Sequence, residues 1–330
     1  MQNVLFISLA LVACCATIVS AGPNCNVLAM SGGGSRGAYE AGVIVGLVNG
    51  LSSGNVTWDV VTGISAGSIV TFGTSLFAVG DEAALAAWLT TTVANLQQDD
   101  VFTHWGLNWE EGLVQGLLFE KGLVNNEPLR KFLTNMLKQY GPVKDRKYVM
   151  GATSLTLGQL VTWNETQPSL IVDAAIASSS IPVVFPDLTF NGDTYVDGGV
   201  IQDVNVIAGI KRCYEMGYAA SNIIVDVVLC NSPHLPTRND SVLESLHTLR
   251  VGERSASIIR YNSGLINTRS AQEAYPNVQW RYLINPTGPL PGDLNFSHDA
   301  LMEMYNMGVS DGATAIKFGY GYGFDFDLQQ

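Results

Sequence analysis

A serine between two glycines is the residue of this chain best suited to chemistry. Residues 63–67 read Gly-Ile-Ser-Ala-Gly, a G-x-S-x-G pattern that follows a short apolar run at 60–62. At a sharp turn between a strand and a helix, such a serine exposes its hydroxyl, and the flanking positions have no room for side chains. The pattern predicts Ser65 as a nucleophile, with Gly63 and Gly67 as the glycines of the turn. Taken alone, it is equally compatible with an ordinary turn.

A glycine-rich segment precedes this serine. Residues 32–37 read Gly-Gly-Gly-Ser-Arg-Gly, between an expected strand and an expected helix. Their spacing matches the G-x-G-x-x-G fingerprint of dinucleotide-binding proteins, which also needs an acidic residue at the end of the next strand. Asp59 precedes that strand instead of ending it. The loop is better suited to offer free backbone N–H groups to an oxyanion near Ser65, because the loops after neighbouring parallel strands meet at one edge of the sheet.

A nucleophilic serine needs a base that accepts its proton. The usual α/β-hydrolase triad ends in a histidine, but the candidates lie in ordinary sequence surroundings: His104, His234, His247 and His298. Asp197 ends an expected strand and is followed by Gly198 and Gly199, so its carboxylate is expected at the same edge as Ser65. A carboxylate, with a reference pKa of about 3.9, can act directly as a base in a dry site. The alternative is a turn aspartate that accepts hydrogen bonds from its own backbone.

Strand and helix patterns alternate along the chain, which predicts an α/β protein with a mostly parallel sheet between two helical layers, a three-layer α/β/α fold. We expect strands at 26–30, 60–62, 148–155, 159–163, 188–190, 194–196, 223–229 and 278–284, and helices at 38–51, 69–79, 81–95, 126–140, 170–178, 205–216, 241–261 and 297–318. No internal repeat or long polar linker interrupts this order. Residues 22–318 are therefore expected to form one domain, followed by a Gly- and aromatic-rich tail at 319–330.

The first 21 residues are almost wholly apolar and end in small residues before Gly22. The run is too short to span a membrane and is typical of a secretory signal peptide cleaved after Ala21. A secreted protein, or one of an endomembrane or lysosomal lumen, is therefore expected, with no transmembrane segment after cleavage. If the source is bacterial, the alternative is a lipid anchor on Cys14, which ends a Leu-Val-Ala-Cys sequence.

Glycosylation sequons and cysteines also bear on whether the protein is secreted. Four asparagines have Ser or Thr two positions on without an intervening proline, and are candidate glycosylation sites: Asn55, Asn164, Asn239 and Asn295. After signal cleavage three cysteines remain, Cys25, Cys213 and Cys230. They allow one disulfide with one thiol left over, in a pairing that the sequence leaves open.

The charge balance narrows the possible partners. The net charge of −12 argues against nucleic acid and against electrostatic capture by anionic lipid. It leaves open an interface made through apolar side chains. Such side chains are frequent in an irregular segment at 99–125, above all between Trp105 and Phe119. The favoured interpretation of that segment is a satellite core, and the alternative is a lipid-facing lip over the site.

Three motifs in order, the glycine-rich loop at 32–37, the turn at 63–67 and Asp197-Gly198-Gly199, resemble those of the patatin-like phospholipase family of Ser–Asp dyad lipid acyl hydrolases. The segment at 177–186, Ala-Ser-Ser-Ser-Ile-Pro-Val-Val-Phe-Pro, is also similar to the family's sequence ahead of its Asp-Gly-Gly motif. The resemblance is strong over residues 26–206 and weak to about 316. Plant members usually have Asp at the position of Ser31, and other members have Ser.

The resemblance implies a patatin-like fold with Ser65 as the nucleophile and Asp197 as the base that accepts its proton. It also implies an oxyanion hole at residues 32–37, formed by backbone amides around Gly33, Gly34 and Arg36 and flanked by Gly32 and Gly37. The implied reaction is that of a phospholipase A type enzyme, which cleaves fatty-acyl esters of phospholipids or related glycerolipids through an acyl-enzyme. It needs no metal and no nucleotide cofactor.

Other functions remain open at this point. The family includes storage proteins and members that prefer transacylation, so a non-catalytic storage or lipid-binding protein is one alternative. A Ser-His-Asp triad esterase is a second. A dinucleotide-binding protein is a third, and the position of Asp59 disfavours it.

Overall fold

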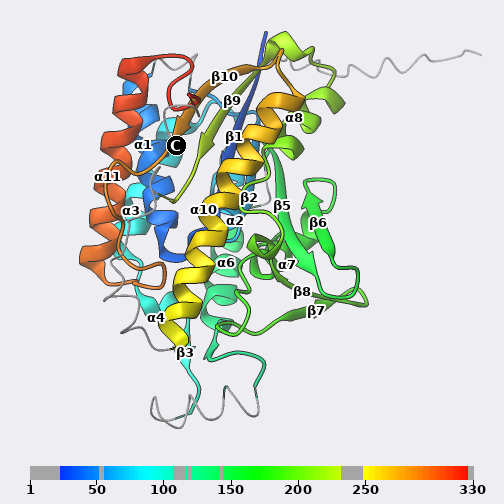
Figure 1. The fold of residues 1–330 in the computed structure, drawn as a ribbon, viewed down its shortest axis with the longest axis vertical. Coiled ribbons are helices and arrows are strands. Elements are labelled where there is room, and N and C mark those ends of the chain that lie inside the picture. Colours follow the sequence, from blue (N-terminus) through cyan, green and yellow to red (C-terminus); the bar gives the residue numbers. More distant parts are fainter. Residues whose placement is uncertain are drawn as a thin grey trace, which may run out of the picture.

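The computed structural model describes residues 23–51, 56–106, 116, 120–141, 144–231 and 248–325. Its centre is a mostly parallel sheet with the strand order β10-β9-β1-β2-β5-β8-β7, in which β6 also pairs with β5 (Figure 1). Five strands are parallel: β1 (Cys25–Met30), β2 (Val60–Ile64), β5 (Lys147–Ser154), β9 (Ile223–Val228) and β10 (Gln279–Ile284). Antiparallel strands complete one edge: β6 (Gln159–Asn164), β7 (Leu188–Phe190) and β8 (Asp193–Asp197).

Helices cover both faces of this sheet. One face packs on α1 (Gly37–Gly50), α2 (Ala66–Ser75), α3 (Glu82–Asn95), α6 (Glu127–Tyr140), α7 (Ile171–Ser178) and α11 (His298–Phe318). The other packs on α8 (Val206–Glu215) and α10 (Thr248–Ala274), which runs diagonally across the sheet in Figure 1. Alternate residues of β1 enter the two cores, Leu28 in one and Val27 in the other, because a strand buried on both faces is apolar throughout. The predicted three-layer α/β/α fold is confirmed.

Close packing of α1 against α11 fixes the helix that follows the glycine-rich loop. A Cβ atom on Gly42 of α1 would lie 2.1 Å from the carbonyl oxygen of Tyr305. One on Gly308 of α11 would lie equally close, 2.1 Å, to the carbonyl oxygen of Tyr39. Only glycine allows the two backbones to approach this far. The two helices therefore hold the start of α1 at the carboxyl edge of the sheet.

The helix expected at 241–261 was wrong at its C-terminal end. α10 continues to Ala274, and residues 241–247 lie outside the described part of the chain. The helix extends because Leu265 and Ala271 pack in the core between the sheet and the helices α8 and α10. The remaining expected elements agree with the structure to within a few residues, although the helix expected at 69–79 begins earlier and ends at Ser75.

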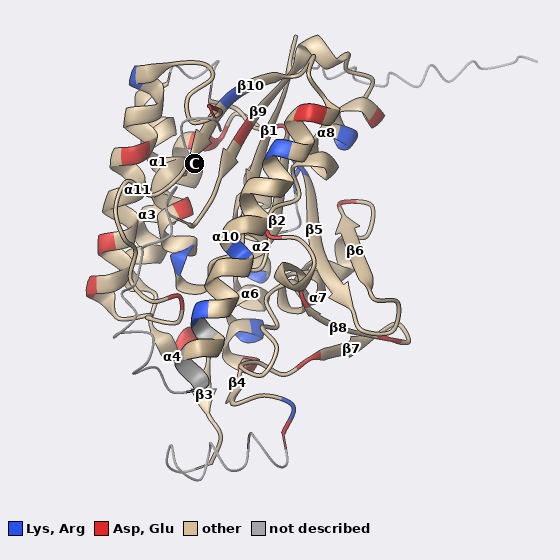
Figure 2. Cartoon of the chain, viewed as in Figure 1, with Lys and Arg blue, Asp and Glu red and all other residues tan. Residues whose placement is uncertain are grey.

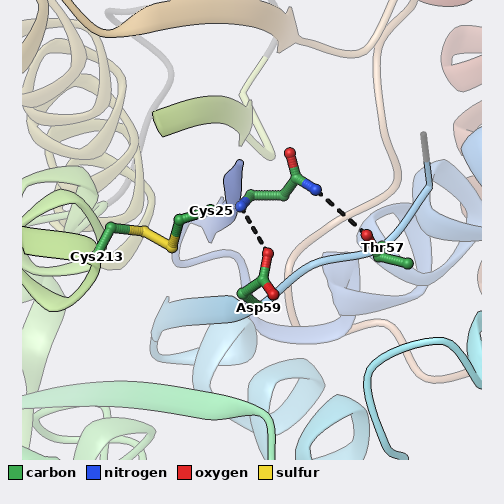
Figure 3. Close-up of a disulfide and its surroundings, with 5 residues drawn as sticks. Cys25, Thr57, Asp59 and Cys213 are labelled. Carbon is green, nitrogen blue, oxygen red and sulfur yellow. Dashed lines mark hydrogen bonds between the residues drawn. A yellow bond between two sulfur atoms is a disulfide. The ribbon is translucent and has the colours of Figure 1, made fainter. Parts of the chain in front are cut away.

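A disulfide joins Cys25 of β1 to Cys213 of α8 (Figure 3). Cys230 is a buried free thiol. At the same end of β1, the amide of Asn26 donates to the Asp59 carboxylate (2.8 Å) and its side chain donates to Thr57 (3.2 Å). Asp59 thus lies at the amino end of β2, the end away from Ser65.

Several expectations concern residues that the structure does not describe, namely the signal peptide, Asn55, Asn239, and most of the segment between Trp105 and Phe119. In the tail, Leu283 donates to the carbonyl oxygen of Tyr322 (2.8 Å), so the chain from Gly319 to Phe324 packs along β10. Among the described helices, none combines the length and the apolar character needed to cross a bilayer.

Candidate active site

Ser65 lies at the sharp turn between β2 and α2, as the G-x-S-x-G pattern predicts. Its backbone adopts φ 53° and ψ −120°, a left-handed conformation that is strained for a residue with a side chain. A Cβ atom on Gly63 would lie 2.1 Å from the carbonyl oxygen of Gly67, and one on Gly67 would lie 2.6 Å from that of Met30. The two glycines let the backbone close on itself and on β1, which directs the serine hydroxyl toward the carboxyl edge.

Asp197 contacts Ser65 directly. The Ser65 hydroxyl donates to Oδ2 of Asp197 at 2.6 Å, and both residues are only 5% exposed. The other carboxylate oxygen, Oδ1, accepts a hydrogen bond from the amide of Gly199 at 2.7 Å. The backbone amide of Asp197 donates to the carbonyl oxygen of Ser180 (2.8 Å). The carboxylate is therefore fixed in orientation against the serine.

The environment of Asp197 makes its carboxylate a stronger base than one in water. Burial raises its pKa to about 6, while the hydrogen bonds from Ser65 and Gly199 and the positive charge of Arg260 act in the opposite direction. A group with this pKa is mostly ionised at neutral pH and still accepts a proton readily. Asp197 meets both requirements of a base for Ser65.

The backbone amides of the glycine-rich loop divide into engaged and free groups. The amide of Gly32 donates to the Asp203 carbonyl oxygen (2.9 Å) and that of Arg36 to the Gly33 carbonyl oxygen (3.1 Å). The amide of Gly37 closes the short 3-10 turn Gly34–Arg36. Within the described residues, the amides of Gly33 and Gly34, and that of Ala66 at the start of α2, have no acceptor. These three donors are the ones left to bind an oxyanion.

A crossing segment before α11 holds this loop in place. The amide of Ser35 donates to the Asp293 carbonyl oxygen (2.8 Å) and its hydroxyl donates to that of Gly292 (3.1 Å). The Arg36 guanidinium donates to the Pro291 carbonyl oxygen (3.1 Å). Sequence reasoning did not identify this segment, because its contacts with the loop are made by backbone oxygens about 255 positions away.

The hydroxyl of Ser178, at the end of α7, supports the turn from behind. It accepts from the backbone amide of Ser65 (2.9 Å), donates to the Gly151 carbonyl oxygen (2.5 Å) and contacts the Ser68 hydroxyl (2.7 Å). Ser68 in turn donates to the Gly63 carbonyl oxygen (2.8 Å). From the sequence, the segment at 177–186 is known only by its resemblance to the family. The contacts of Ser178 with the turn at Ser65 are visible only in the structure.

The described histidines lie apart from this constellation. His104 and His298 are exposed and neither hydrogen-bonds to Ser65, while His234 and His247 lie outside the described residues. Among the described residues, no group of His, Cys, Asp and Glu is arranged to hold a metal ion.

A mostly apolar cavity adjoins Ser65. About 980 Å³ of space free of protein atoms, open solvent included, lies between the glycine-rich loop, α1, α2, α3 and α6. Apolar side chains form most of its wall, among them Ile69, Trp88, Leu89, Phe132, Ile181 and Leu294. Such a cavity suits an extended hydrocarbon group whose polar end lies at Ser65.

Two of the four sequons lie in the described part of the chain. Asn295 is exposed, and its side-chain oxygen accepts from the amide of Ser297 (3.1 Å). Asn164 is half-buried, and its side-chain oxygen accepts from both the amide and the hydroxyl of Thr166.

Fold and site together define an α/β protein with a serine and a carboxylate in contact beside an apolar cavity. The family model for patatin-like phospholipases matches residues 28–210, more than half of the chain. The chain belongs to the patatin-like phospholipase family, which confirms the resemblance read from the motifs and supports lipid hydrolase activity.

Individual relatives are more distant. The chain is 24% identical to the probable lipid hydrolase 463L of Invertebrate iridescent virus 6, over 71% of this chain and 88% of the viral protein. Among solved structures, VipD from Legionella pneumophila is similar with a TM-score of 0.41 and 14% identity, over 91% of this chain and 68% of VipD. The type III effector protein ExoU of Pseudomonas aeruginosa is similar with a TM-score of 0.38 and 11% identity, over 90% of this chain and 53% of ExoU.

Proposed function

We propose that this protein is a lipid acyl hydrolase of the phospholipase A type, with Ser65 as nucleophile and Asp197 as its base. The observation that carries the proposal is the 2.6 Å hydrogen bond between the two side chains at the end of an apolar cavity. A hydroxyl and a base in hydrogen-bond contact are what nucleophilic catalysis requires.

The reaction follows from these positions. Ser65 Oγ attacks the carbonyl carbon of a fatty-acyl ester as its proton passes to Oδ2 of Asp197. The negative charge on the carbonyl oxygen is stabilised by the free amides of Gly33, Gly34 and Ala66, and each well-placed donor of this kind contributes about 3 kcal/mol. Collapse of this intermediate releases the alcohol, which takes the proton from Asp197, and leaves the acyl group on Ser65. Water then attacks the carbonyl carbon of the acyl-enzyme and gives a proton to Asp197. The bond between this carbon and Ser65 Oγ breaks, Asp197 returns the proton to Oγ, and fatty acid is released.

Exposed apolar side chains around the mouth of the cavity support a phospholipid or glycerolipid at a membrane or micelle surface as substrate. Val183 is 67% exposed and has φ 73°, an unusual conformation for a β-branched residue, between two residues that line the cavity. Leu294, at 37% exposure, lines it directly. Burial of such apolar side chains in a lipid monolayer removes them from water and stabilises the bound protein.

The proposed location is outside the cell or in an endomembrane or lysosomal lumen. The Cys25–Cys213 disulfide supports this location, because structural disulfides persist mainly in oxidising compartments. Asn295 is the described sequon most accessible to modification, because its side chain is exposed. A lipid anchor on Cys14 is the alternative if the source is bacterial. Intact mass of the protein purified from its own source, before and after glycosidase treatment, distinguishes the two.

The test measures fatty-acid release from phosphatidylcholine vesicles. Ser65→Ala and Asp197→Ala should each abolish release while circular dichroism shows an unchanged fold. Full activity in Asp197→Ala, with loss in His298→Ala, would indicate a triad esterase. Vesicle binding without any release in the unmodified protein would indicate a storage or lipid-binding protein. Profiles on phospholipids, galactolipids and triacylglycerols then define the preferred substrate.

A further inference from the structure

A second carboxyl group lies beside the dyad. Asp203, six positions after Asp197, is fully buried in the loop before α8. Its carbonyl oxygen accepts from the amide of Gly32 at 2.9 Å. Its own amide donates to the side-chain oxygens of Ser263 and Asn267 on α10, both at 3.1 Å. The backbone of Asp203 therefore ties the start of the glycine-rich loop to α10.

The carboxyl group of Asp203 sits between two glycines. Its Oδ1 lies 3.0 Å from the position of a Cβ atom on Gly32, and its Oδ2 lies 3.0 Å from that of a Cβ on Gly264. Among the described residues neither oxygen has a hydrogen-bond partner. An ionised carboxylate that is fully buried without a partner is strongly disfavoured, whereas the protonated acid is tolerated. The contacts therefore favour the neutral acid.

Charged and titratable groups face Asp203 from every element around it. They are Arg260 on α10, Asp197 at the end of β8, Arg36 in the glycine-rich loop, Glu40 on α1 and Cys230 after β9. Figure 2 colours the Lys and Arg positions along α10 blue. Arg260 already pairs with Asp293, and the Arg36 guanidinium donates to the Pro291 carbonyl oxygen. Burial raises the pKa of Asp203 to about 7; Arg260 opposes this shift, and the negative charge of Asp197 adds to it.

We propose that Asp203 is a positioning residue that must be a neutral acid for the Ser65–Asp197 site to work. This inference rests on the proposed function. As a neutral group, Asp203 packs against Gly32 and keeps the loop in place. Once ionised, it adds a second negative charge beside Asp197 and beside the amides that bind the oxyanion, so formation of the tetrahedral intermediate is disfavoured.

The consequence is a bell-shaped pH profile without a histidine. Activity rises as Asp197 ionises and falls as Asp203 ionises, and because the two carboxyls interact, the profile reports the pair. Asp197 ionises first, because its carboxylate accepts hydrogen bonds from Ser65 and Gly199. The Gly32 amide also lies near the Asp203 carboxyl and favours its ionised form, but this amide donates to the Asp203 backbone carbonyl oxygen instead.

The test compares the unmodified protein with Asp203→Asn, which has nearly the same shape and cannot ionise. The rate at which a fluorophosphonate probe labels Ser65 is measured from about pH 5 to about pH 9. On the alkaline limb of the unmodified protein's profile, the labelling rate should fall about tenfold for each unit that the pH rises. Asp203→Asn should keep the acid limb and lose the alkaline one. Glu40→Gln removes the ionisable group of another buried carboxyl near Asp203, whose pKa burial raises well above its usual range, and should keep both limbs.

Two results would overturn the inference: an alkaline limb that persists in Asp203→Asn, or a folded Asp203→Asn that is unreactive at every pH. Absence of labelling in the unmodified protein would instead refute the proposed function. In that case infrared difference spectra still test the neutral acid itself. The unmodified protein should lose one more protonated carboxyl band between about pH 6 and pH 8 than Asp203→Asn does, since Asp197 titrates in both proteins. Identical difference spectra for the two proteins would contradict the inference.

Discussion

Replacing Asp197 by Asn should stabilise the fold at neutral pH while it removes activity. The carboxylate is 5% exposed, and burial raises its pKa to about 6. Asn can retain both hydrogen bonds, since its oxygen can accept from Gly199 and its amide can donate to Ser65. The substitution therefore removes mainly the cost of burying a charge.

The magnitude follows from proton linkage. The folded-state pKa of Asp197 lies about two units above the unfolded value of about 3.9, so the folded state binds the proton more tightly. The destabilisation by the ionised form is absent below about pH 4, grows as pH rises, and is complete above about pH 6. At 1.36 kcal/mol per unit, it amounts to at most ~3 kcal/mol. Loss of the base should lower the rate by about 10²- to 10⁴-fold.

The assay is urea unfolding at about pH 4 and pH 8, with activity measured in parallel. Asp197→Asn should match the unmodified protein at the lower pH and exceed its stability at the higher one. Asp193→Asn, in the same strand, is the matched control, because hydrogen bonds from Ser154 and Thr156 lower the pKa of Asp193. Asp193→Asn should be less stable than the unmodified protein at pH 8. An Asp197→Asn variant that is less stable at pH 8, or equally stabilised at both pH values, would refute the reasoning.

Three further predictions concern the surroundings of the dyad. Ser178→Ala leaves the Ser65 amide without its buried acceptor and should cost about 1–3 kcal/mol in urea unfolding and slow fluorophosphonate labelling. Gly67→Ala places a Cβ atom 2.6 Å from the Met30 carbonyl oxygen and should lower the unfolding free energy by about 1–3 kcal/mol, with a larger loss of activity; unchanged labelling would contradict it. Val183→Glu should lower the affinity for phosphatidylcholine vesicles, measured by flotation, about tenfold or more. Phe318→Glu, which removes an apolar side chain with 70% exposure at the end of α11, should leave that affinity unchanged. Equal effects of these two charges would argue against a lipid-facing mouth.

The sequence predicted the layered fold and the motifs because both depend on local signals. Apolar strands that end in glycines mark the carboxyl edge of the sheet, and Ser65 and Asp197 meet there at 2.6 Å. The family is confirmed, whereas the catalytic roles of these two residues stay predictions. For the glycine-rich loop the prediction was broader than the geometry, since the amides of Gly32 and Arg36 are already engaged.

What the sequence could not predict depends on contacts between distant segments. Asp226 interrupts an apolar strand without any local reason; in the structure it accepts from Trp58 (2.8 Å) and pairs with Arg281 of β10. The roles of Ser178 and Asp203 likewise depend on hydrogen bonds to residues of other elements. The end of α10 was misjudged because Ala271 packs on a core that local patterns do not reveal.

The most direct test of the account is identification of the residue that becomes acylated. Brief incubation with a fatty-acyl ester, acid quenching and peptide mass spectrometry should find the acyl group on Ser65. Asp197→Ala should lack the adduct, and His104→Ala and His298→Ala should retain it. An adduct on any other residue, or an undiminished Ser65 adduct in Asp197→Ala, would contradict the Ser65–Asp197 dyad.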